Sequence, residues 1–262
     1  MAKTTRTKTS RAKGGNATGA AKRPSRAIVV VDQKSGPQTR RPAKVIIVGA
    51  GVGGLTLALM LHQRGIGSVV YEQASSIQPV GAGINVLPHA IRELADLDLI
   101  PVLDQVGIRT HELIYMNRIG QVVWREPRGI AAGFEVPQYS IHRGRLQQML
   151  YDVVLQRLGP DAIVTGRKLA GFIQGEGGVT AHFVDSVEGN HSETVRGEVL
   201  IGADGIHSAV RAHYFPHQGA PSWNGIQMWR GVADFPVFLD GHSMIIAGGM
   251  SAKFVLYPIS SS

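Results

Sequence analysis

Residues 44–72 hold the clearest hydrophobic pattern in the chain. Lys44–Val48 and Ser68–Glu72 are short apolar runs, and Gly53–Arg64 between them carries apolar residues at helical spacing. A glycine-rich turn joins the first run to the helical segment. The pattern predicts a strand, a helix and a second strand, which is a βαβ unit of an α/β fold.

Two further helices and a hairpin are indicated downstream. Pro88 stands where a first helical residue belongs and predicts a helix over His89–Leu97. Arg143–Leu158 is predicted as a long amphipathic helix that Gly159 and Pro160 end; its apolar face comprises Leu146, Met149, Leu150, Val153, Val154 and Leu158. The segments on either side of the Asn117–Gly120 turn predict the hairpin His111–Met116 and Gln121–Trp124.

The second half of the chain alternates like β structure. An antiparallel meander is predicted from four segments, namely Ala162–Val164, Lys168–Ile173, Val179–Val184 and Thr194–Val199. Val199–Ile201 is apolar and breaks at Gly202, after which Ile206–Tyr214 is expected to be helical. Ile226–Ile259 is expected to form strands separated by glycine turns.

The glycine turn carries the first candidate chemistry. Gly49, Gly51 and Gly54 spell G-x-G-x-x-G, and Glu72 follows about 20 residues on, as in dinucleotide-binding βαβ units. The first glycine allows the tight turn, the second lets the backbone approach a pyrophosphate, and the third lets helix and strand pack closely. The helix N-terminus offers N–H groups to phosphates, and Glu72 can accept hydrogen bonds from a ribose.

An exported or membrane-inserted segment is the competing interpretation of this stretch. Val45–Leu61 is uncharged and follows Arg40, Arg41 and Lys44, which superficially resembles a twin-arginine signal. Four glycines interrupt the run, however, and it is short for a membrane span. We therefore expect a protein with no membrane partner.

The charge of the chain is concentrated at its beginning. The net charge is +8 over 262 residues, but residues 1–44 contain 12 Lys or Arg and one acid, whereas the rest contains 15 basic and 18 acidic residues. Residues 1–42 are predicted to be a disordered basic tail, because they hold too little apolar surface to offset the ordering entropy. The alternatives for this tail are a contact with nucleic acid or a membrane surface, a transit peptide, or a start codon assigned too far upstream. The apolar patch Ala27–Val31 is not assigned to a strand.

The composition of the chain excludes several kinds of site, and a second motif adds a candidate cofactor residue. The chain has no cysteine, which excludes disulfides and thiolate chemistry and fits a cytoplasmic location. His213 and His217 are four residues apart without further ligands, so no metal site is expected. In LIGADGIHSAVR, residues 200–211, an apolar strand leads to a turn and a helix, so that Asp204 can cap this helix or reach a cofactor.

Taken together, the motifs resemble those of the class A flavoprotein aromatic monooxygenases, which share the fold of 4-hydroxybenzoate hydroxylase, and especially their phenazine-modifying members. GAGVGG with Glu72, YSIHRGRLQQML (residues 139–150) and GADGIHSAVR carry the resemblance in this order. It extends over residues 44–260, with support from the segments 81–94, 123–133, 137–144, 228–232 and 254–260. The implied fold is a Rossmann-like FAD-binding βαβ domain with an antiparallel-sheet substrate domain.

The resemblance implies an activity and a set of site residues. It implies an enzyme that uses FAD, NADH or NADPH, and O₂ to hydroxylate an aromatic or phenazine-like substrate through a flavin C4a-hydroperoxide. The cofactor-binding residues would be Gly49, Gly51, Gly53 and Gly54 at the pyrophosphate, Glu72 at the ribose, Arg143 at the phosphate and ribityl region, Leu169 near the adenine, and Asp204 and Gly205 at both FAD and NAD(P)H. Residues 83–85 would approach the isoalloxazine, and Trp229 and Arg230 would lie on a substrate-domain strand facing an aromatic acid. No catalytic acid or base is singled out.

One departure from the family pattern affects the expected domains. The later G-D-A-A-H-P motif of such enzymes is absent from the sequence, so we expect an N-terminal part, with both domains incomplete at the C-terminus. The domains would be a tail over 1–42, an FAD-binding domain over 43–215 with 110–138 partly in the substrate sheet, and the start of a substrate domain over 216–262. Oligomeric state is left open.

Three alternative functions remain at this point. The chain could be a non-catalytic fragment that binds FAD weakly or not at all. It could be an NAD-dependent Rossmann dehydrogenase, which would leave the segments around Arg143 and Asp204 unexplained. Nucleic-acid binding through the tail is a poor third, because the tail has no interleaved aromatic residues. Trp124, Trp223 and Trp229 are expected to be core residues rather than pocket walls.

Overall fold

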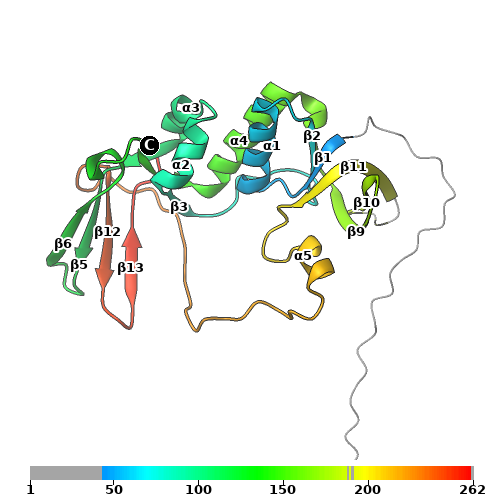
Figure 1. Cartoon of the computed structure of the whole chain (residues 1–262). Coiled ribbons are helices and arrows are strands. Elements are labelled where there is room, and N and C mark those ends of the chain that lie inside the picture. Colours follow the sequence, from blue (N-terminus) through cyan, green and yellow to red (C-terminus); the bar gives the residue numbers. More distant parts are fainter. Residues whose placement is uncertain (1–42, 188, 190–191, 261–262) are drawn as a thin grey trace, which may run out of the picture. The chain divides into compact units, whose positions relative to one another are not determined.

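The computed structural model describes residues 43–187, 189 and 192–260, all within one compact unit. The predicted basic tail over 1–42, with its patch Ala27–Val31, lies outside the described residues. Figure 1 shows the arrangement of the helices and strands. Within the described residues, no helix combines the length and the apolar character needed to cross a membrane.

A six-stranded sheet contains the predicted βαβ unit. Its strand order is β8-β2-β1-β11-β10-β9, and β2 and β11 both pair with β1 in parallel. The strand bounds are β1 Ala43–Val48, β2 Ser68–Tyr71, β8 Ile163–Val164, β9 Arg167–Gly175, β10 Gly178–Asp185 and β11 Ser192–Gly202. Helix α1, Val52–Gln63, connects β1 to β2, so the prediction for this region is confirmed.

Strand β1 is buried on both faces, and its alternate side chains enter two different cores. Val45 and Ile47 pack into a cluster with residues of α1 and of α4, Arg143–Leu158. Ile46 and Val48 point into a second cluster, in which the strands β9, β10 and β11 supply most of the partners. A period of two residues along a strand produces this division. The two cores fix the end of β1, from which the glycine turn begins.

Two smaller sheets complete the fold. The three-stranded sheet has the order β3-β7-β4, with the bounds β3 Gly83–Val86, β7 Gln138–His142 and β4 Gly107–Thr110. The four-stranded sheet has the order β13-β12-β5-β6, with the bounds β13 Lys253–Leu256, β12 Ser243–Gly248, β5 Glu112–Met116 and β6 Val122–Pro127. The remaining helices are α2 Pro88–Ala95, α3 Ile100–Val106, α5 Ala209–Tyr214 and the 3₁₀ turns η1 Gly129–Ala132 and η2 Pro160–Ala162. The predicted hairpin and the predicted helix that Pro88 starts are confirmed.

The predicted four-stranded meander is confirmed for its last three segments, which lie in β9, β10 and β11, and is wrong for its first. Strand β8 does not join the meander but pairs in parallel with β2, because it follows helix α4 and returns to the sheet in the same direction. Strand β11 is a single run of 11 residues that pairs antiparallel with β10 and parallel with β1. The apolar run Val199–Ile201 is therefore the end of β11 and delivers the chain to Gly202.

The prediction of strands over Ile226–Ile259 is wrong for its first half. Residues 215–242 contain no helix and no strand, and Figure 1 shows them as the long connection between α5 and β12. Glycines and prolines recur through this segment, and both residue types weaken a ladder of backbone hydrogen bonds.

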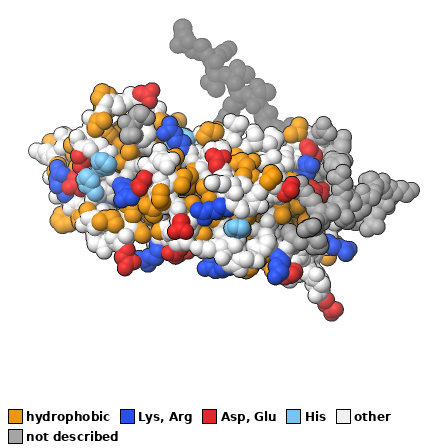
Figure 2. All heavy atoms as spheres, turned by 90° about the horizontal axis from the view of Figure 1, so that it is seen from above, with side chains coloured by type: hydrophobic (Ala, Val, Ile, Leu, Met, Phe, Trp, Pro, Cys, Tyr) orange, Lys and Arg blue, Asp and Glu red, His pale blue; other side chains and the backbone are white. Residues whose placement is uncertain are grey.

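The three tryptophans, expected in the core, are also exposed. Trp124, Trp223 and Trp229 are 62%, 76% and 87% exposed, so the expectation is wrong for all of them. Trp124 lies on β6, the last strand in the order of its sheet, and the other two lie in the irregular segment 215–242. Figure 2 shows one face of the molecule on which hydrophobic side chains reach the surface between charged ones.

Candidate functional site

The glycine turn at the end of β1 contains two kinds of glycine. Gly49 has φ +107°, and a Cβ there would overlap the backbone of Ala203; a Cβ on Gly54 would overlap the carbonyl oxygen of Gly49. These two glycines are thus required by the packing of the chain on itself. A Cβ on Gly51 or Gly53, in contrast, would meet nothing within 4 Å. The turn therefore leaves open space beside Gly51 and Gly53, which side chains at these two positions would fill. We call this space the cradle.

Helix α1 begins directly at this cradle. Its N-cap is Gly51, no side chain caps it, and its first turn contains no acidic residue. The N–H groups of the first turn and the positive end of the helix dipole are consequently available to an anion. The Gln147 side chain donates to the carbonyl of Ala50 at 2.8 Å, which ties helix α4 to the turn.

The Glu72 carboxylate lies against the same turn. Its Oε2 accepts a hydrogen bond from the backbone N–H of Ala50 at 2.7 Å, and its Oε1 accepts one from Ala74 at 2.8 Å. Each carboxylate oxygen can accept more than one hydrogen bond, so acceptor capacity remains for a hydroxyl pair. The structure thus brings Glu72 and the cradle together, as the sequence spacing predicts.

Asp204 caps the helix that follows it, which is one of the two roles that the sequence left open. Its Oδ2 accepts hydrogen bonds from Ala209 at 2.6 Å and from Val210 at 3.3 Å, so it does cap α5, together with Ser208. Its Oδ1 is buried and has no hydrogen-bond partner among the described residues. Buried acceptors are normally satisfied, so an unpartnered carboxylate oxygen beside the turn marks a place for a donor from a ligand.

Arg143 and Arg230 line one pocket. This pocket has a volume of about 320 Å³ and is completed by Gly81, Ala82 and Gly231. Gly81 has φ +126°, and a Cβ there would lie 2.9 Å from Arg143 Nε, so the glycine gives the guanidinium its room. Two guanidinium groups at one pocket favour an anionic ligand, either phosphate or carboxylate.

The remaining predicted site residues are Leu169, Gly205, Trp229 and Arg230, and they differ in their surroundings. The Leu169 side chain is buried in the second core on β9, so only its backbone could face a ligand. Gly205 has φ +74° with open space beside it. Trp229 and Arg230 do not lie on a strand, which corrects the expected location, and Trp229 is almost fully exposed.

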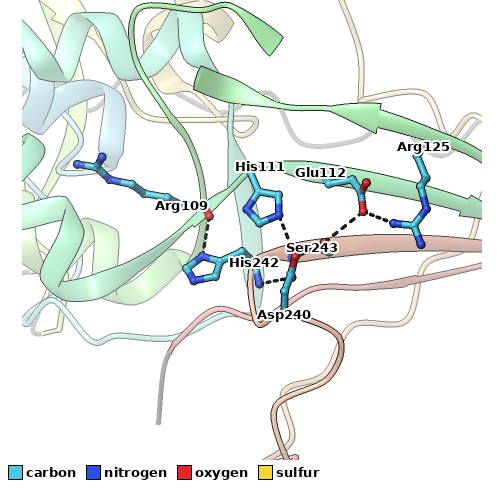
Figure 3. Close-up of polar contacts among 7 residues, drawn as sticks. All are labelled: Arg109, His111, Glu112, Arg125, Asp240, His242 and Ser243. Carbon is cyan, nitrogen blue, oxygen red and sulfur yellow. Dashed lines mark hydrogen bonds and ion pairs between the residues drawn. The ribbon is translucent and has the colours of Figure 1, made fainter. Parts of the chain in front are cut away.

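A polar cluster that the sequence reasoning missed anchors the end of the irregular segment. Asp240 Oδ2 lies 2.8 Å from His111 Nε2, and its Oδ1 accepts hydrogen bonds from the backbone N–H groups of His242 and Ser243 at 2.8 Å (Figure 3). Burial favours a higher pKa for Asp240, but the hydrogen bonds from His242 and Ser243 outweigh it and lower the pKa to about 2. The Asp-Gly pair at 240–241 is the turn signal that points to this feature.

The cluster also fixes the neighbouring strands. His242 Nδ1 lies 3.0 Å from the carbonyl oxygen of Arg109, and the His111 and His242 rings stack with their centroids 5.7 Å apart. Arg125 pairs with Glu112 at 2.6 Å within the same view (Figure 3). Among the described residues, no group of acidic and histidine side chains is arranged to hold a metal ion.

The turn, the carboxylate and the family comparison agree on the class of protein. The chain belongs to the family described as FAD binding domain, which matches residues 42–247. FAD is therefore the dinucleotide of this fold. The residues fit it, because the cradle, the helix N-terminus and the unpartnered Asp204 oxygen provide space and hydrogen-bonding groups for a pyrophosphate and hydroxyls.

Individual relatives are named as a hydroxylase and a monooxygenase. The chain is 44% identical over 225 residues to the phenazine 1,6-dicarboxylic acid hydroxylase of Lysobacter antibioticus, covering 85% of this chain and 55% of the relative. It is 35% identical over 191 residues to the aurachin C monooxygenase/isomerase of Stigmatella aurantiaca, covering 72% of this chain and 47% of the relative. The chain thus spans about half the length of the curated relatives it matches.

A solved structure extends the likeness to the fold. HpxO of Klebsiella pneumoniae, crystallised with FAD and uric acid, matches with a TM-score of 0.63 and 25% identity, covering 84% of this chain and 54% of that one. The expected fold class, a mixed α/β fold with parallel and antiparallel sheets, is confirmed.

Proposed function

We propose that the protein is an FAD-dependent monooxygenase that consumes NADH or NADPH and hydroxylates an aromatic or phenazine-like substrate with O₂. The observation that carries this proposal is the open cradle at Gly51 and Gly53 in a chain of the FAD binding domain family. When bound and reduced, FAD supplies the activation of O₂. The lack of cysteine supports a cytoplasmic location as part of the proposal.

In this proposal the residues of the turn hold and orient the cofactor. The N–H groups at the start of α1 bind the pyrophosphate over Gly51, and Glu72 accepts hydrogen bonds from the adenosine ribose. Asp204 Oδ1 accepts a hydrogen bond from a ribityl hydroxyl, while its Oδ2 keeps helix α5 in place. Leu169 offers backbone groups to the adenine, and Gly205 keeps the approach to the site open.

Arg143 and Arg230 divide the pocket between cofactor and substrate. Arg143 begins α4, the helix that Gln147 ties to the glycine turn, so its guanidinium serves the phosphate and ribityl end. Arg230 enters from the irregular segment and faces the acidic group of the substrate. An anionic aromatic substrate agrees with the name of the relative that acts on phenazine 1,6-dicarboxylic acid.

The proposal is tested by turnover with a defined product. NADH or NADPH oxidation is measured with FAD present, across aromatic acids and phenazines, and the hydroxylated product is identified. We expect oxidation that the correct substrate stimulates and that yields stoichiometric product. Oxidation without product, or a protein that binds no FAD, would contradict the proposed activity.

A variant of Arg230 tests the substrate assignment. Arg230→Gln removes the charge and is expected to raise KM for a carboxylated substrate about tenfold or more, with a smaller effect on kcat, because a charge-assisted hydrogen bond is lost. Arg230→Lys keeps the charge and serves as the matched control. An unchanged KM in Arg230→Gln would remove Arg230 from the substrate site.

A further inference from the structure

A layer of buried polar side chains lies on the three-stranded sheet. Among the described residues, four polar side chains are buried: Thr110, Gln138 and Ser140 on this sheet, and Ser243 on β12. Ser140 and Gln138 alternate along β7 with Tyr139 and Ile141, which enter the first hydrophobic core. The polar residues therefore occupy the opposite face of the sheet. Core positions are usually apolar, because burying a polar side chain costs free energy unless the side chain is hydrogen-bonded.

Hydrogen bonds on this face form a chain with one direction. Ser140 Oγ donates to Asn85 Oδ1 at 2.7 Å, since a carbonyl oxygen can only accept. The serine hydroxyl has a single proton, so the hydroxyl of Thr110, 2.6 Å from Ser140 Oγ, must be the donor in that contact. The chain runs from Thr110 through Ser140 to Asn85 and holds the amide oxygen of Asn85 on the protein side.

The other end of the Asn85 amide is left for a ligand. Asn85 Nδ2 makes no hydrogen bond to a described residue, and it is not among the buried atoms without a partner, so solvent reaches it. Asn85 lies on β3 on the same face as Gly83, where an added Cβ would lie 2.6 Å from the ring of Tyr257.

The backbone around Asn85 connects it to the proposed cofactor site. The residues just before β3, Gly81 and Ala82, line the pocket of Arg143 and Arg230. The backbone N–H of Arg143 donates to Ala82 at 3.0 Å. Helix α4 thus contacts the glycine turn through Gln147 and the pocket through Arg143, and Asn85 lies three residues beyond Ala82 of that pocket.

We propose that Asn85 donates a hydrogen bond to an acceptor atom of the bound flavin ring or of the substrate beside it, and that Ser140 and Thr110 are positioning residues that fix the orientation of its amide. An asparagine amide presents a donor and an acceptor that differ only by a rotation. With its oxygen held by Ser140, Asn85 presents only N–H groups and selects a carbonyl, carboxylate or ring nitrogen. This inference rests on the proposed function.

Two variants and a matched control test it in the FAD-loaded protein. Asn85→Asp still accepts the hydrogen bond from Ser140 but lacks the N–H donors, and Ser140→Ala lets the amide rotate. Ser243→Ala is the control, because this hydroxyl is also buried but donates its single proton to one of two carboxylates, Asp240 at 3.1 Å or Glu112 at 3.4 Å. Thr110→Ser, which keeps the hydroxyl, should restore the behaviour that Thr110→Val loses.

The readouts distinguish the two possible acceptors. If the acceptor is on the flavin, Asn85→Asp and Ser140→Ala shift the flavin absorbance spectrum and the reduction potential without substrate. If it is on the substrate, these stay unchanged, and substrate KM rises about tenfold, the effect of one hydrogen bond. Ser243→Ala should lower thermal stability and change neither readout.

Two different negative results distinguish a failure of the Asn85 proposal from a failure of the proposed FAD-dependent function. If the FAD-loaded variants change only in melting temperature, as Ser243→Ala does, the chain of hydroxyls is structural and this inference is wrong, while the proposed function stands. If the wild-type protein binds no FAD, the proposed function is wrong and the inference falls with it.

Discussion

The glycine turn and the segment 215–242 each supply a residue to the proposed site, but they are built in different ways. In the turn, Gly54 is required by a local contact with the carbonyl oxygen of Gly49, and Gly49 is required by the backbone of Ala203. The segment has no regular structure, and its end is held by Asp240, which pairs with a histidine 129 residues earlier in the sequence. A short glycine motif therefore marks the first region in the sequence, whereas no motif joins His111 to Asp240 in the second.

The largest effect is expected when the turn's internal packing is broken. In Gly54→Ala the new Cβ would overlap the carbonyl oxygen of Gly49, and the variant should lose about 3 kcal/mol of unfolding free energy or fail to fold. Urea unfolding measures the loss. Gly53→Ala, one residue earlier and facing open space, is the control and should be as stable as the wild type. Equal destabilisation by both would contradict the distinction between the two kinds of glycine.

The next largest effect concerns the open cradle itself. Gly51→Val keeps an extended backbone that valine tolerates, so the protein should fold, with a loss of roughly 1 kcal/mol at the N-cap. Its side chain would occupy the cradle, and FAD affinity should fall at least about a hundredfold, as the close approach of a pyrophosphate requires glycine. Flavin content after purification and a fluorescence titration give the affinity. Retention of bound flavin would remove the pyrophosphate from this position.

A smaller effect is expected at the carboxylate beside the cradle. Glu72→Gln removes the negative charge and one of the two acceptor oxygens, so FAD binding should weaken about tenfold through the loss of a charge-assisted hydrogen bond. Glu176→Gln, an exposed glutamate between β9 and β10, is the matched control. If both variants bind FAD like the wild type, the ribose lies elsewhere.

The smallest effects belong to the irregular segment. Asp240→Ala should cost about 1 kcal/mol, because the hydrogen bonds that close the turn before β12 are lost and the carboxylate is half exposed. Trp229→Ala, at a position that is 87% exposed, should change stability by less than about 0.5 kcal/mol. If Trp229→Ala proves the more destabilising of the two, the tryptophan is covered in solution.

The Asp240 contribution should depend on pH in one direction. The folded-state pKa of about 2 lies below the ordinary value of 3.8, so the charged form is favoured by folding. Its stabilisation is present above pH 3.8 and is lost as the pH falls toward 2. The stability difference between wild type and Asp240→Ala should therefore shrink over this interval in denaturant titrations. A difference that grows toward low pH would contradict the lowered pKa of Asp240.

Sequence reasoning succeeded where a pattern is local and failed where partners are distant. The period of helix α4 and the spacing of the glycine turn gave the correct elements, because 3.6-residue and two-residue periods follow directly from burial of one face. Strands β3 and β4, of four residues each, were missed, since neither is long enough to show an alternation. The roles of all the predicted cofactor and substrate residues stay predictions; these residues are Gly49, Gly51, Gly53, Gly54, Glu72, Arg143, Leu169, Asp204, Gly205, Trp229 and Arg230.

The missed parts of the site share one cause. The pocket that joins Arg143 to Arg230 and the contact of His111 with Asp240 both connect positions far apart in the sequence. No periodicity in one segment carries information about the other. The expectation of buried tryptophans failed for a related reason, because an apolar side chain in a segment without regular structure has no sheet or helix face that directs it inward.

The central claim is that the turn at Gly51 binds FAD rather than a nicotinamide dinucleotide. A calorimetric titration of the flavin-free protein with FAD and with NADH, each repeated on Gly51→Val, tests it directly. The account predicts that FAD binds more tightly than NADH and that Gly51→Val abolishes FAD binding in a protein that remains folded. Tighter binding of NADH than of FAD, or FAD binding that Gly51→Val leaves intact, would contradict it.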